Sequence, residues 1–467
     1  MVGPGSPGSA EWTRRRLLQS LAAFPSLAAL PVLGCGRRKR PDVLLVIVDD
    51  LNDWAGCLGG HPQARTPNID RLAASGMLFR NAHCPAPTCN PSRTSVLTGI
   101  PATVHGLYGN GIPFRNRLPD AVTLPQHMRR HGYEALGCGK IFHAVVDEPS
   151  WSEYFAPTVR LTEPWPNNGI SRGFDWGAHD LAPLETSDGQ LVSWATKKLR
   201  EAREAPLFLA VGFGRPHLPW FAPRDFFAPF RPEDTRLPAV REDDLADVPR
   251  AARQLARLPS DSHPVILRRG LWHEAVAAYL ACGHYLDWLV GELLAAFEPR
   301  RADGAIVALW SDHGFHLGEK RHWRKWTLWH ESTRVPLVLA APGRIDPGQT
   351  CDRPVTATAL GATLADLCGL PPFGEVPPLT PLLDDPDDAG SPPAVIGLRR
   401  HAALCADDWR YIRYVDGSEE LYDTRRDPSE WNNLAGSPAH AAKKAELAAL
   451  LPRGHDVPGG RDDDHDG

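Results

Sequence analysis

Cys89 and Arg93 lie in a short segment whose pattern could hold an anion. Asn90 before Pro91 is typical of a helix N-cap followed by a proline in the first turn, and Gly99 is placed to end that helix. Cys89 is therefore expected just outside a helix N-terminus, where free backbone N–H groups and the helix dipole favour negative charge. Arg93, one turn further on, adds a fixed positive charge. Taken alone, such a segment is more often a proline-rich loop with a buried free cysteine.

Further polar residues follow four apolar runs of the chain. The runs 42–48, 133–138, 206–212 and 305–310 have the composition of strands, and the first is continuously apolar, as in a strand buried on both faces. They lead into side chains that could bind a cation or transfer a proton: Asp49, Asp50, Lys140, His143, His217, Asp312 and His313. Singly, an aspartate pair usually caps a helix, and an isolated lysine or histidine is usually a surface or core residue. Their shared position at strand ends is what indicates a common site.

Helical patterns at 66–75, 123–131, 191–204 and 274–297 separate these runs, and a strand at 335–340 and a helix at 356–370 follow. Alternating strands and helices predict an α/β fold with a large, mostly parallel central sheet flanked by helices. Ligands of such sheets bind beyond the carboxyl ends of the strands, so the polar residues are expected on one rim. Lys325 follows Asp312 closely, in a charged aromatic loop at 319–326. Long loops are expected at 144–185 and 221–264.

The end of the chain has a different pattern. A linker rich in proline and aspartate at 371–393 precedes short strand patterns at 394–398, 402–406, 409–415 and 420–422, and a helical pattern at 439–451. These predict a small C-terminal α+β subdomain with an antiparallel sheet. We expect four regions: an export segment at 1–40, a main domain at 41–380, a C-terminal subdomain at 381–452 and a disordered acidic tail at 453–467.

Composition excludes some functions. The 467 residues carry a formal net charge of -5, which offers no basic field for a nucleic acid backbone. The 42% hydrophobic content suffices for a packed core. Nine cysteines spread along the chain do not form a disulfide framework, and at most one or two bridges are expected.

The N-terminus predicts export. Arg14-Arg15-Arg16 has the appearance of a twin-arginine signal, and the apolar segment at 17–34 is interrupted by Pro25 and Pro31, so it is a poor membrane-spanning helix. Cys35 closes a stretch similar to a bacterial lipobox, which predicts a lipid anchor on this residue. An ordinary cleaved signal with an incidental cysteine is the alternative. The protein is expected in the periplasm or anchored to a membrane as a lipoprotein.

Together these segments resemble the type I, formylglycine-dependent sulfatases of the alkaline phosphatase-like superfamily. The resemblance covers most of residues 41–435. It rests on an ordered set of motifs: Asp49-Asp50, Thr66-Pro67-Asn68, Cys89-Asn90-Pro91-Ser92-Arg93, Leu97-Thr98-Gly99, Gly139-Lys140, Asp312-His313-Gly314 and Leu421-Tyr422-Asp423. The segments around His143, His217 and Leu317-Gly318-Glu319 are most similar to iduronate-2-sulfatases.

The resemblance implies a mechanism. Cys89 would be converted to formylglycine by a formylglycine-generating enzyme, and one hydroxyl of the hydrated aldehyde would attack sulfur. One divalent cation, Ca²⁺ or else Mg²⁺, would be held by Asp49, Asp50, Asp312, His313 and the modified residue 89. The remaining family positions are the charge-stabilising Arg93, Lys140 and Lys325, the base His143 that helps release sulfate, and the acid His217 that protonates the leaving alcohol.

The substrate is expected to be a sulfated sugar of an acidic polysaccharide or glycosaminoglycan-like oligosaccharide. The particular sugar stays open, because Phe315 and Trp326 replace a tryptophan and a tyrosine of the iduronate-specific enzymes. Candidate contacts for carboxylate or sulfate are Arg115, Arg215, Arg224 and Arg324, although arginines of this kind are more often surface residues.

Two other functions are compatible with these residues. A phosphonate monoester or phosphodiester hydrolase of the same superfamily can carry the same nucleophile and metal ligands. An inactive polysaccharide-binding protein would have lost a key residue, and none is missing here.

Overall fold

The computed structural model describes residues 40–157, 168, 170, 173–257 and 262–451. The twin-arginine segment, Cys35 and the acidic tail lie outside these residues, so export, lipidation and tail disorder stay predictions. A search of the described helices finds none with the length and apolar character needed to cross a membrane. The eight described cysteines are all free thiols, within the expectation of few bridges.

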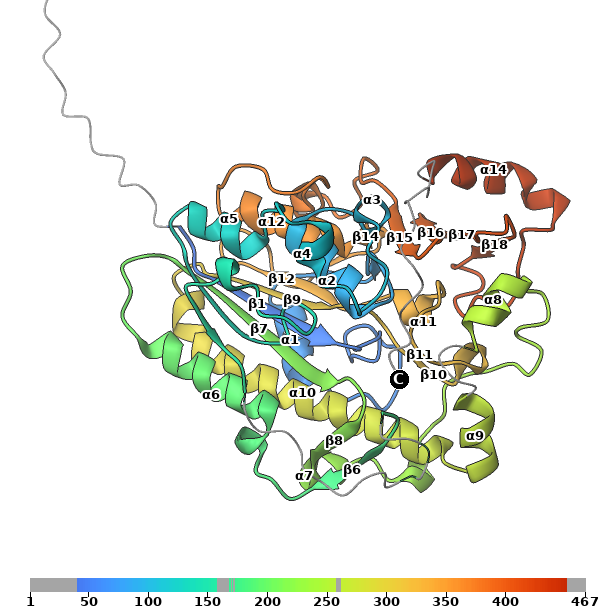
Figure 1. Ribbon diagram of the computed structural model, residues 1–467, viewed down its shortest axis with the longest axis horizontal. Coiled ribbons are helices and arrows are strands. Elements are labelled where there is room, and N and C mark those ends of the chain that lie inside the picture. The colour runs from blue at the N-terminus through green and yellow to red at the C-terminus, as the bar shows by residue number, and fades with distance from the viewer. Residues whose placement is uncertain (1–39, 158–167, 169, 171–172, 258–261, 452–467) are drawn as a thin grey trace, which may run out of the picture. The chain divides into compact units, whose positions relative to one another are not determined.

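An eight-stranded sheet forms the centre of the fold, in the order β13-β2-β12-β9-β1-β7-β4-β5 (Figure 1). β12 runs antiparallel to β9 and β2, whereas the other neighbours in the sheet are parallel. The predicted α/β fold with a mostly parallel sheet is therefore confirmed. The strands are β1 (Val43–Asp49), β2 (Met77–Phe79), β4 (Glu134–Gly139), β5 (Glu153–Phe155), β7 (Leu207–Pro216), β9 (Ile306–Ser311), β12 (Leu337–Ala340) and β13 (Gln349–Cys351).

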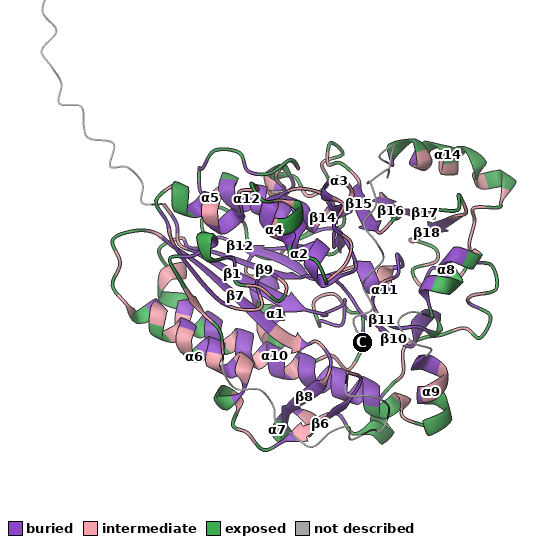
Figure 2. Ribbon diagram, in the orientation of Figure 1, coloured by how far each residue is buried: buried purple, intermediate pink, exposed green. Residues whose placement is uncertain are grey.

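β1 explains why the centre of the sheet needs helices on both faces. Its alternate residues belong to two separate apolar clusters, because successive side chains of a strand point to opposite faces. Leu44, Val46 and Val48 face α1 (Pro67–Ala74), α6 (Ser187–Arg200) and α10 (Trp272–Arg301). The alternate residues Val43, Leu45 and Ile47 face α2 (Cys89–Thr98), α5 (Leu124–Arg130) and α12 (Leu360–Leu367). Figure 1 shows α6 and α10 on one side of the sheet and α2, α5 and α12 on the other, and Figure 2 shows the strands buried between them.

A second, antiparallel sheet follows near the C-terminus, as predicted. It consists of β15 (Ala394–Leu398), β16 (His401–Ala406), β17 (Trp409–Arg413) and β18 (Glu419–Asp423), each paired with the next. One apolar cluster joins this sheet to α14 (Ala441–Leu450), and another joins it to α8 (Arg250–Leu255) and Trp329. The proposed boundaries between the regions of the chain stay predictions.

Three segments predicted as loop or linker contain regular structure, so that part of the prediction was wrong. Region 144–185 holds η1 (Glu148–Ser150), β5, β6 (Trp176–His179) and η2 (Pro183–Glu185), and α13 (Thr380–Asp384) lies in the linker. Region 221–264 holds most of β8 (Trp220–Pro223), α7 (Arg224–Phe227), η3 (Pro232–Asp234) and α8, and α9 (Ser262–Arg269) starts there. These elements are too short to show periodicity, and β5 and β6 depend on pairing with strands distant in sequence.

The remaining elements are short. They are β3 (Ala82–His83), α3 (Ala102–His105), α4 (Phe114–Arg117), β10 (His316–Leu317), η4 (Glu319–Arg321), β11 (Trp323–Arg324), α11 (His330–Thr333), β14 (Val355–Thr356), η5 (Ala357–Ala359) and η6 (Pro438–His440). β10 and β11 form the hairpin that carries the loop before Lys325.

The N-terminus of α1 is capped by a residue of another helix. The side chain of Thr66, its N-cap residue, makes no capping hydrogen bond. Instead the carboxylate of Asp287 on α10 accepts hydrogen bonds from the backbone N–H groups of Asn68 and Ile69, at 2.9 and 2.8 Å, and from Asn68 Nδ2 at 2.7 Å. Asp287 therefore fixes α1 against α10 on the face of the sheet that they share.

We expect Asp287→Ala to lower the free energy of unfolding by about 2–3 kcal/mol, because it leaves buried N–H donors without an acceptor. Glu292→Ala on the exposed surface of the same helix is the matched control, with an expected change of at most about 0.5 kcal/mol. Urea unfolding measures both. Equal stability of the two variants would contradict this role of Asp287.

Candidate active site

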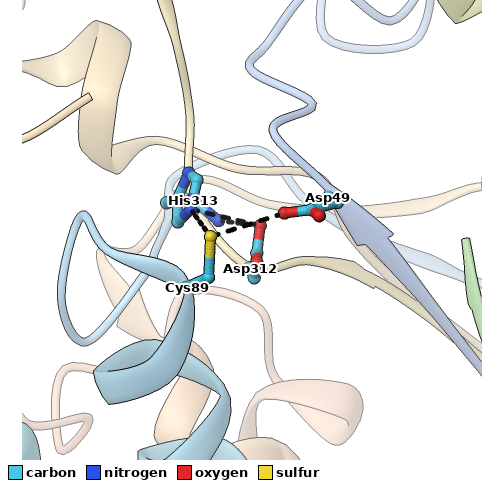
Figure 3. Close-up of side chains that lie close together, drawn as sticks. All are labelled: Asp49, Cys89, Asp312 and His313. Atoms are coloured by element: carbon cyan, nitrogen blue, oxygen red, sulfur yellow. Dashed lines mark hydrogen bonds and ion pairs between the residues drawn. The ribbon is translucent and has the colours of Figure 1, made fainter. Parts of the chain in front are cut away.

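The carboxyl ends of four neighbouring strands meet at one place. β9, β1, β7 and β4 are consecutive in the sheet, and they lead into Asp312, Asp49, His217 and Lys140 respectively. The ligand atoms of Asp49, Cys89, Asp312 and His313 all lie within 4.8 Å of one another (Figure 3). The same holds for those of Asp49, Asp50, Cys89 and His217. Parallel pairing thus collects residues that are up to 264 positions apart in the chain.

Cys89 is the first residue of α2, and its N-cap residue is Thr88. The prediction that Asn90 is the N-cap, with Cys89 outside the helix, was wrong by two residues. The Asn90 side chain instead donates hydrogen bonds to the backbone carbonyls of Gly109 and Ile112, at 2.9 and 2.7 Å. Gly99 ends the helix in the left-handed conformation, at φ 70°, as predicted.

Arg93 joins α2 to two carboxylates. Its Nε donates to Asp312 Oδ2 at 2.7 Å, its Nη2 lies 3.6 Å from Asp49 Oδ1, and its Nη1 donates to the carbonyl of Lys140. Burial raises the pKa of Asp312 to about 6, although the guanidinium of Arg93 acts in the opposite direction. Arg93 is completely buried and contacts both aspartates, so it holds the two carboxylates in a fixed orientation.

Two lysines neutralise the aspartate pair and approach the thiol. Lys140 Nζ lies 2.5 Å from Asp49 Oδ2, and Lys325 Nζ lies 2.8 Å from Asp50 Oδ1. The same ammonium groups are 3.7 and 3.2 Å from Cys89 Sγ. Burial alone would raise the pKa of the Cys89 thiol, but the charges of Lys140 and Lys325 outweigh it and hold this pKa well below its usual value. The site therefore stabilises an anion at residue 89.

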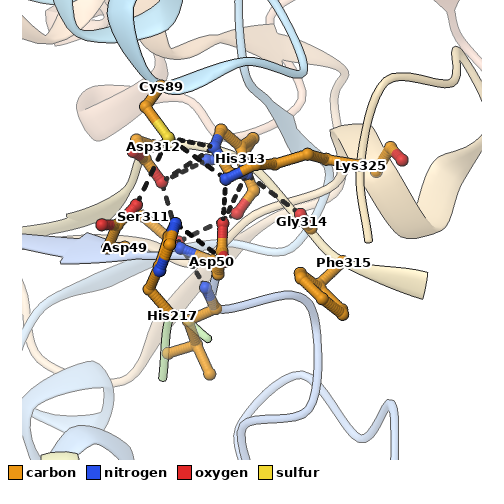
Figure 4. Close-up of polar contacts among 12 residues, drawn as sticks. Asp49, Asp50, Cys89, His217, Ser311, Asp312, His313, Gly314, Phe315 and Lys325 are labelled. Carbon is orange, nitrogen blue, oxygen red and sulfur yellow. Dashed lines mark hydrogen bonds and ion pairs between the residues drawn. The ribbon is translucent and has the colours of Figure 1, made fainter. Parts of the chain in front are cut away.

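The two histidines differ in exposure. His313 is buried, with Nε2 at 3.2 Å from Cys89 Sγ and Nδ1 at 3.3 Å from Asp50 Oδ1. The side chain of His217 is 37% exposed, and its Nε2 lies 3.8 Å from Asp50 Oδ2 (Figure 4). His217 Nδ1 bonds to the carbonyl of Leu218, so Nδ1 carries the hydrogen and Nε2 faces the site. The side chain of Lys140 is 23% exposed, so Lys140 and His217 both keep contact with solvent.

His143 is the one predicted site residue that the structure does not connect to the others. It is half-buried, and its Nδ1 has no hydrogen-bond partner among the described residues. It follows Ile141, whose carbonyl accepts a hydrogen bond from Arg93 Nη1 at 3.3 Å. The segment that carries His143 is thus held against α2, while the imidazole stays without a contact to the cluster.

Several supporting residues were missed from the sequence. The hydroxyl of Tyr279 on α10 donates to the carbonyl of Asp50 at 2.8 Å and accepts from the backbone N–H of Asn52 at 3.0 Å. Ser311 Oγ accepts from the backbone N–H of Leu51 at 3.0 Å. Asp50 has φ 68°, a conformation that costs about 1–2 kcal/mol for most side chains, and these bonds hold it there.

No local signal could have found Tyr279, which lies on the buried face of a long helix more than 200 positions away. Phe315 packs beneath the site, with its ring 5.9 Å from that of Tyr279 and 1% of its surface exposed. Its substitution for tryptophan is thus a change in the buried support of the site.

The donors fit a divalent cation. Each of the two overlapping groups of donor atoms contains two carboxylates and an imidazole, and carboxylate oxygens are the ligands that Ca²⁺ and Mg²⁺ prefer. The three aspartates are balanced by Arg93, Lys140 and Lys325 without any ion. A divalent cation would therefore make the site positive, which suits an anionic ester.

A buried cysteine among paired aspartates and cations, at the carboxyl ends of parallel strands, has the charges that the hydrolysis of an anionic ester requires. Residues 41–370 match the family model of the sulfatases, and the chain belongs to the sulfatase family. It is accordingly a sulfatase, an enzyme that hydrolyses sulfate esters.

Proteins with similar sequences support the assignment of the chain to the sulfatase family. The chain is 34% identical to a sulfatase of Formosa agariphila, over 89% of this chain and 87% of the relative. It is 31% identical to iduronate 2-sulfatase of Homo sapiens, over 73% of this chain and 70% of the relative. Among solved structures, a phosphonate monoester hydrolase of Agrobacterium radiobacter matches with a TM-score of 0.75 and 23% identity, over 88% of this chain and 95% of that one. At this identity the last comparison shows the fold alone.

We expect the unmodified, metal-free protein to carry a thiolate at residue 89 that persists well below the pH at which ordinary cysteines ionise. Lys325→Met should raise the pKa of this thiol, because it removes one of the two adjacent positive charges. The ultraviolet absorbance of the thiolate, followed against pH and corrected with Cys89→Ser, measures the shift. The other described cysteines have raised pKa values and do not interfere near neutral pH. An unchanged titration in Lys325→Met would contradict this electrostatic role.

Proposed function

We propose that the protein removes sulfate from a sugar of an acidic polysaccharide or glycosaminoglycan-like oligosaccharide, with a formylglycine made from Cys89 as the nucleophile. The observation that carries this proposal is the position of Cys89 Sγ, buried 3.2 Å from both Lys325 Nζ and His313 Nε2. The sulfur atom stands where a hydroxyl oxygen of the hydrated aldehyde would lie. The similarity to iduronate 2-sulfatase supports the class of sugar.

The first step transfers the sulfuryl group to residue 89. One hydroxyl oxygen of the hydrated formylglycine attacks sulfur, and the bond between sulfur and the sugar oxygen breaks. Arg93, Lys140 and Lys325 stabilise the negative charge of the sulfate during this step, since each already faces an anion in the site. A divalent cation held by Asp49, Asp50, Asp312 and His313, Ca²⁺ or else Mg²⁺, would lower the pKa of the nucleophile and neutralise sulfate oxygens.

His217 supplies the proton that the departing sugar oxygen needs. Its Nε2 faces the site, and its side chain lies at the open side, where the sugar has to bind. Burial lowers the pKa of His217, although the charges of Asp50 and Asp49 act in the opposite direction. An acid catalyst has to start in the protonated form, which the charges of Asp50 and Asp49 favour.

The second step restores the aldehyde. The remaining hydroxyl of residue 89 loses its proton, the carbon–oxygen bond to the sulfate breaks, and sulfate leaves. We assign the base to His143, whose Nδ1 has no partner among the described residues. This step explains the modification of cysteine, because a serine in the same place would keep the sulfate as a stable ester.

Cys89→Ala should lose activity on an aryl sulfate and on sulfated uronic acids by at least about 10³-fold, because it removes the nucleophile. Mass spectrometry of the protein from its native host should show residue 89 as formylglycine. Normal turnover by Cys89→Ala would refute the mechanism, and a thiol as the only form found would favour a polysaccharide-binding protein instead.

Matched aryl sulfate and aryl phosphonate substrates test the reaction class. The wild-type protein should have the higher kcat/KM on the sulfate, because the proposed site is made for a sulfuryl group. A preference for the phosphonate by orders of magnitude would instead assign the protein to the phosphonate hydrolases of this superfamily.

Removing divalent cations with a chelator should abolish sulfatase activity and lower the melting temperature, since an ion that binds only the folded protein stabilises it. Ca²⁺ should restore both, with Mg²⁺ as the comparison. Asp312→Asn should weaken the Ca²⁺ dependence of the melting temperature, whereas Asp352→Asn on the exposed surface should leave it unchanged. A chelated enzyme with full activity would contradict the proposed metal site.

A further inference from the structure

Arginines near the site differ in what they contact. Arg115 pairs with Asp147, with both hydrogen bonds at 2.8 Å. Arg224 pairs on the surface with Asp180 at 2.8 Å. Both guanidinium groups therefore have a carboxylate partner, and neither needs a ligand.

Arg215 and Arg324 have no carboxylate partner among the described residues. The guanidinium of Arg215 is nevertheless hydrogen-bonded within the protein, because its Nη1 donates to the carbonyls of His217 and Pro219 at 2.8 and 3.1 Å. The side chain of Arg324 makes no hydrogen bond or ion pair with any described residue, and its Nε atom is buried. Of the four candidate contacts, Arg324 is thus the one whose guanidinium makes neither a hydrogen bond nor an ion pair with a described residue.

The position of Arg324 places it beside the reaction centre. It directly precedes Lys325, whose Nζ lies 3.2 Å from Cys89 Sγ. Its guanidinium carbon lies 5.3 Å from the centre of the Phe174 ring. Phe174 in turn packs against Trp220, with ring centres 5.9 Å apart, and Trp220 follows shortly after His217. Arg324 therefore lies between Lys325 and the rings of Phe174 and Trp220, which lead to the segment of His217.

The backbone holds Arg324 in this place. Arg324 and Trp326, on either side of Lys325, have φ values of 79° and 72°, in the left-handed region that side chains rarely adopt. Such conformations persist where the surrounding structure enforces them, and they are common at ligand sites. The hairpin of β10 and β11, in which Arg324 pairs with His316, supplies this constraint.

A guanidinium stays charged at any physiological pH, and a charge that is largely withdrawn from water needs a counter-charge. The carboxylate whose field reaches Arg324 is that of Asp50, which is already paired with Lys325 at 2.8 Å. The missing counter-charge is thus an anion that arrives with the ligand. The planar guanidinium can bind a carboxylate or a sulfate through two parallel hydrogen bonds.

We propose that Arg324 binds a second anionic group of the substrate, a uronic acid carboxylate or another sulfate, next to the ester that is hydrolysed. This proposal rests on the proposed function. It makes Arg324 a specificity-determining residue, and it restricts the preferred substrates to sugars with at least two negative groups.

Three sulfate esters separate the sources of the anion: an aryl sulfate with one charge, a sulfated uronic acid, and a disulfated hexosamine without a carboxylate. The variants are Arg324→Gln, Arg324→Lys and, as the matched control, Arg224→Gln. For each we measure kcat and KM on the mature enzyme with Ca²⁺, and circular dichroism confirms folding.

Wild-type enzyme should prefer one of the two doubly charged substrates over the aryl sulfate. Arg324→Gln should reduce that preference, expressed as the ratio of kcat/KM values, by roughly 10- to 100-fold, mainly through KM. Arg324→Lys should recover part of it, and Arg224→Gln should keep the wild-type ratio. A loss confined to the uronic acid identifies a carboxylate, and a loss confined to the hexosamine identifies a sulfate.

The proposal is overturned if Arg324→Gln keeps the wild-type ratio, or if it weakens all three substrates equally, as a purely structural role would. In both cases the proposed function survives, because the wild-type enzyme still hydrolyses sulfate esters. A wild-type enzyme inactive on all three substrates overturns both proposals.

Discussion

The pairing of buried carboxylates with buried cations is the interaction on which the site depends. Asp49, Asp50 and Asp312 lie at the ends of neighbouring strands, where like charges would repel one another in a medium that screens poorly. Arg93, Lys140 and Lys325 reduce this repulsion from three separate elements. Removal of one partner of such a buried pair typically costs about 3–5 kcal/mol. The site is therefore a feature that the fold has to stabilise, as well as the proposed place of reaction.

The same charges explain why residue 89 suits a nucleophile. The cations that neutralise the aspartates also face Cys89, so a negative charge at this position is stabilised before any substrate binds. Backbone geometry contributes too, since Asp50 is held in a left-handed conformation by Tyr279 on the longest helix. Catalytic and supporting residues thus come from both faces of the sheet: α2 brings Cys89 and Arg93 from one face, and α10 brings Tyr279 from the other.

Much of this arrangement follows from sequence. The apolar run of β1 ending in two aspartates, and the run of β9 ending in Asp312 and His313, each identify a buried strand and the side chains at its end. The rule that parallel strands bind ligands at their carboxyl ends then predicts that these side chains meet. The prediction was weaker where elements are short: β5 and β6 were missed, and the cap of α2 was assigned to Asn90 instead of Thr88. There the structure depends on distant partners, such as the carbonyls of Gly109 and Ile112 that bind Asn90.

The sequence by itself determined which residues could do chemistry, the α/β class of the fold and the edge of the sheet at which the site lies. These properties depend on local patterns: apolar runs, the residues that end them, and the helices between them. Only the tertiary structure decided which lysine pairs with which aspartate, that Tyr279 and Ser311 support the site, and that Arg324 has no described partner while Arg115 and Arg224 do. The physical reason is that an ion pair depends on the distance between two charges in space, and the order of the strands and the conformation of the loops set that distance.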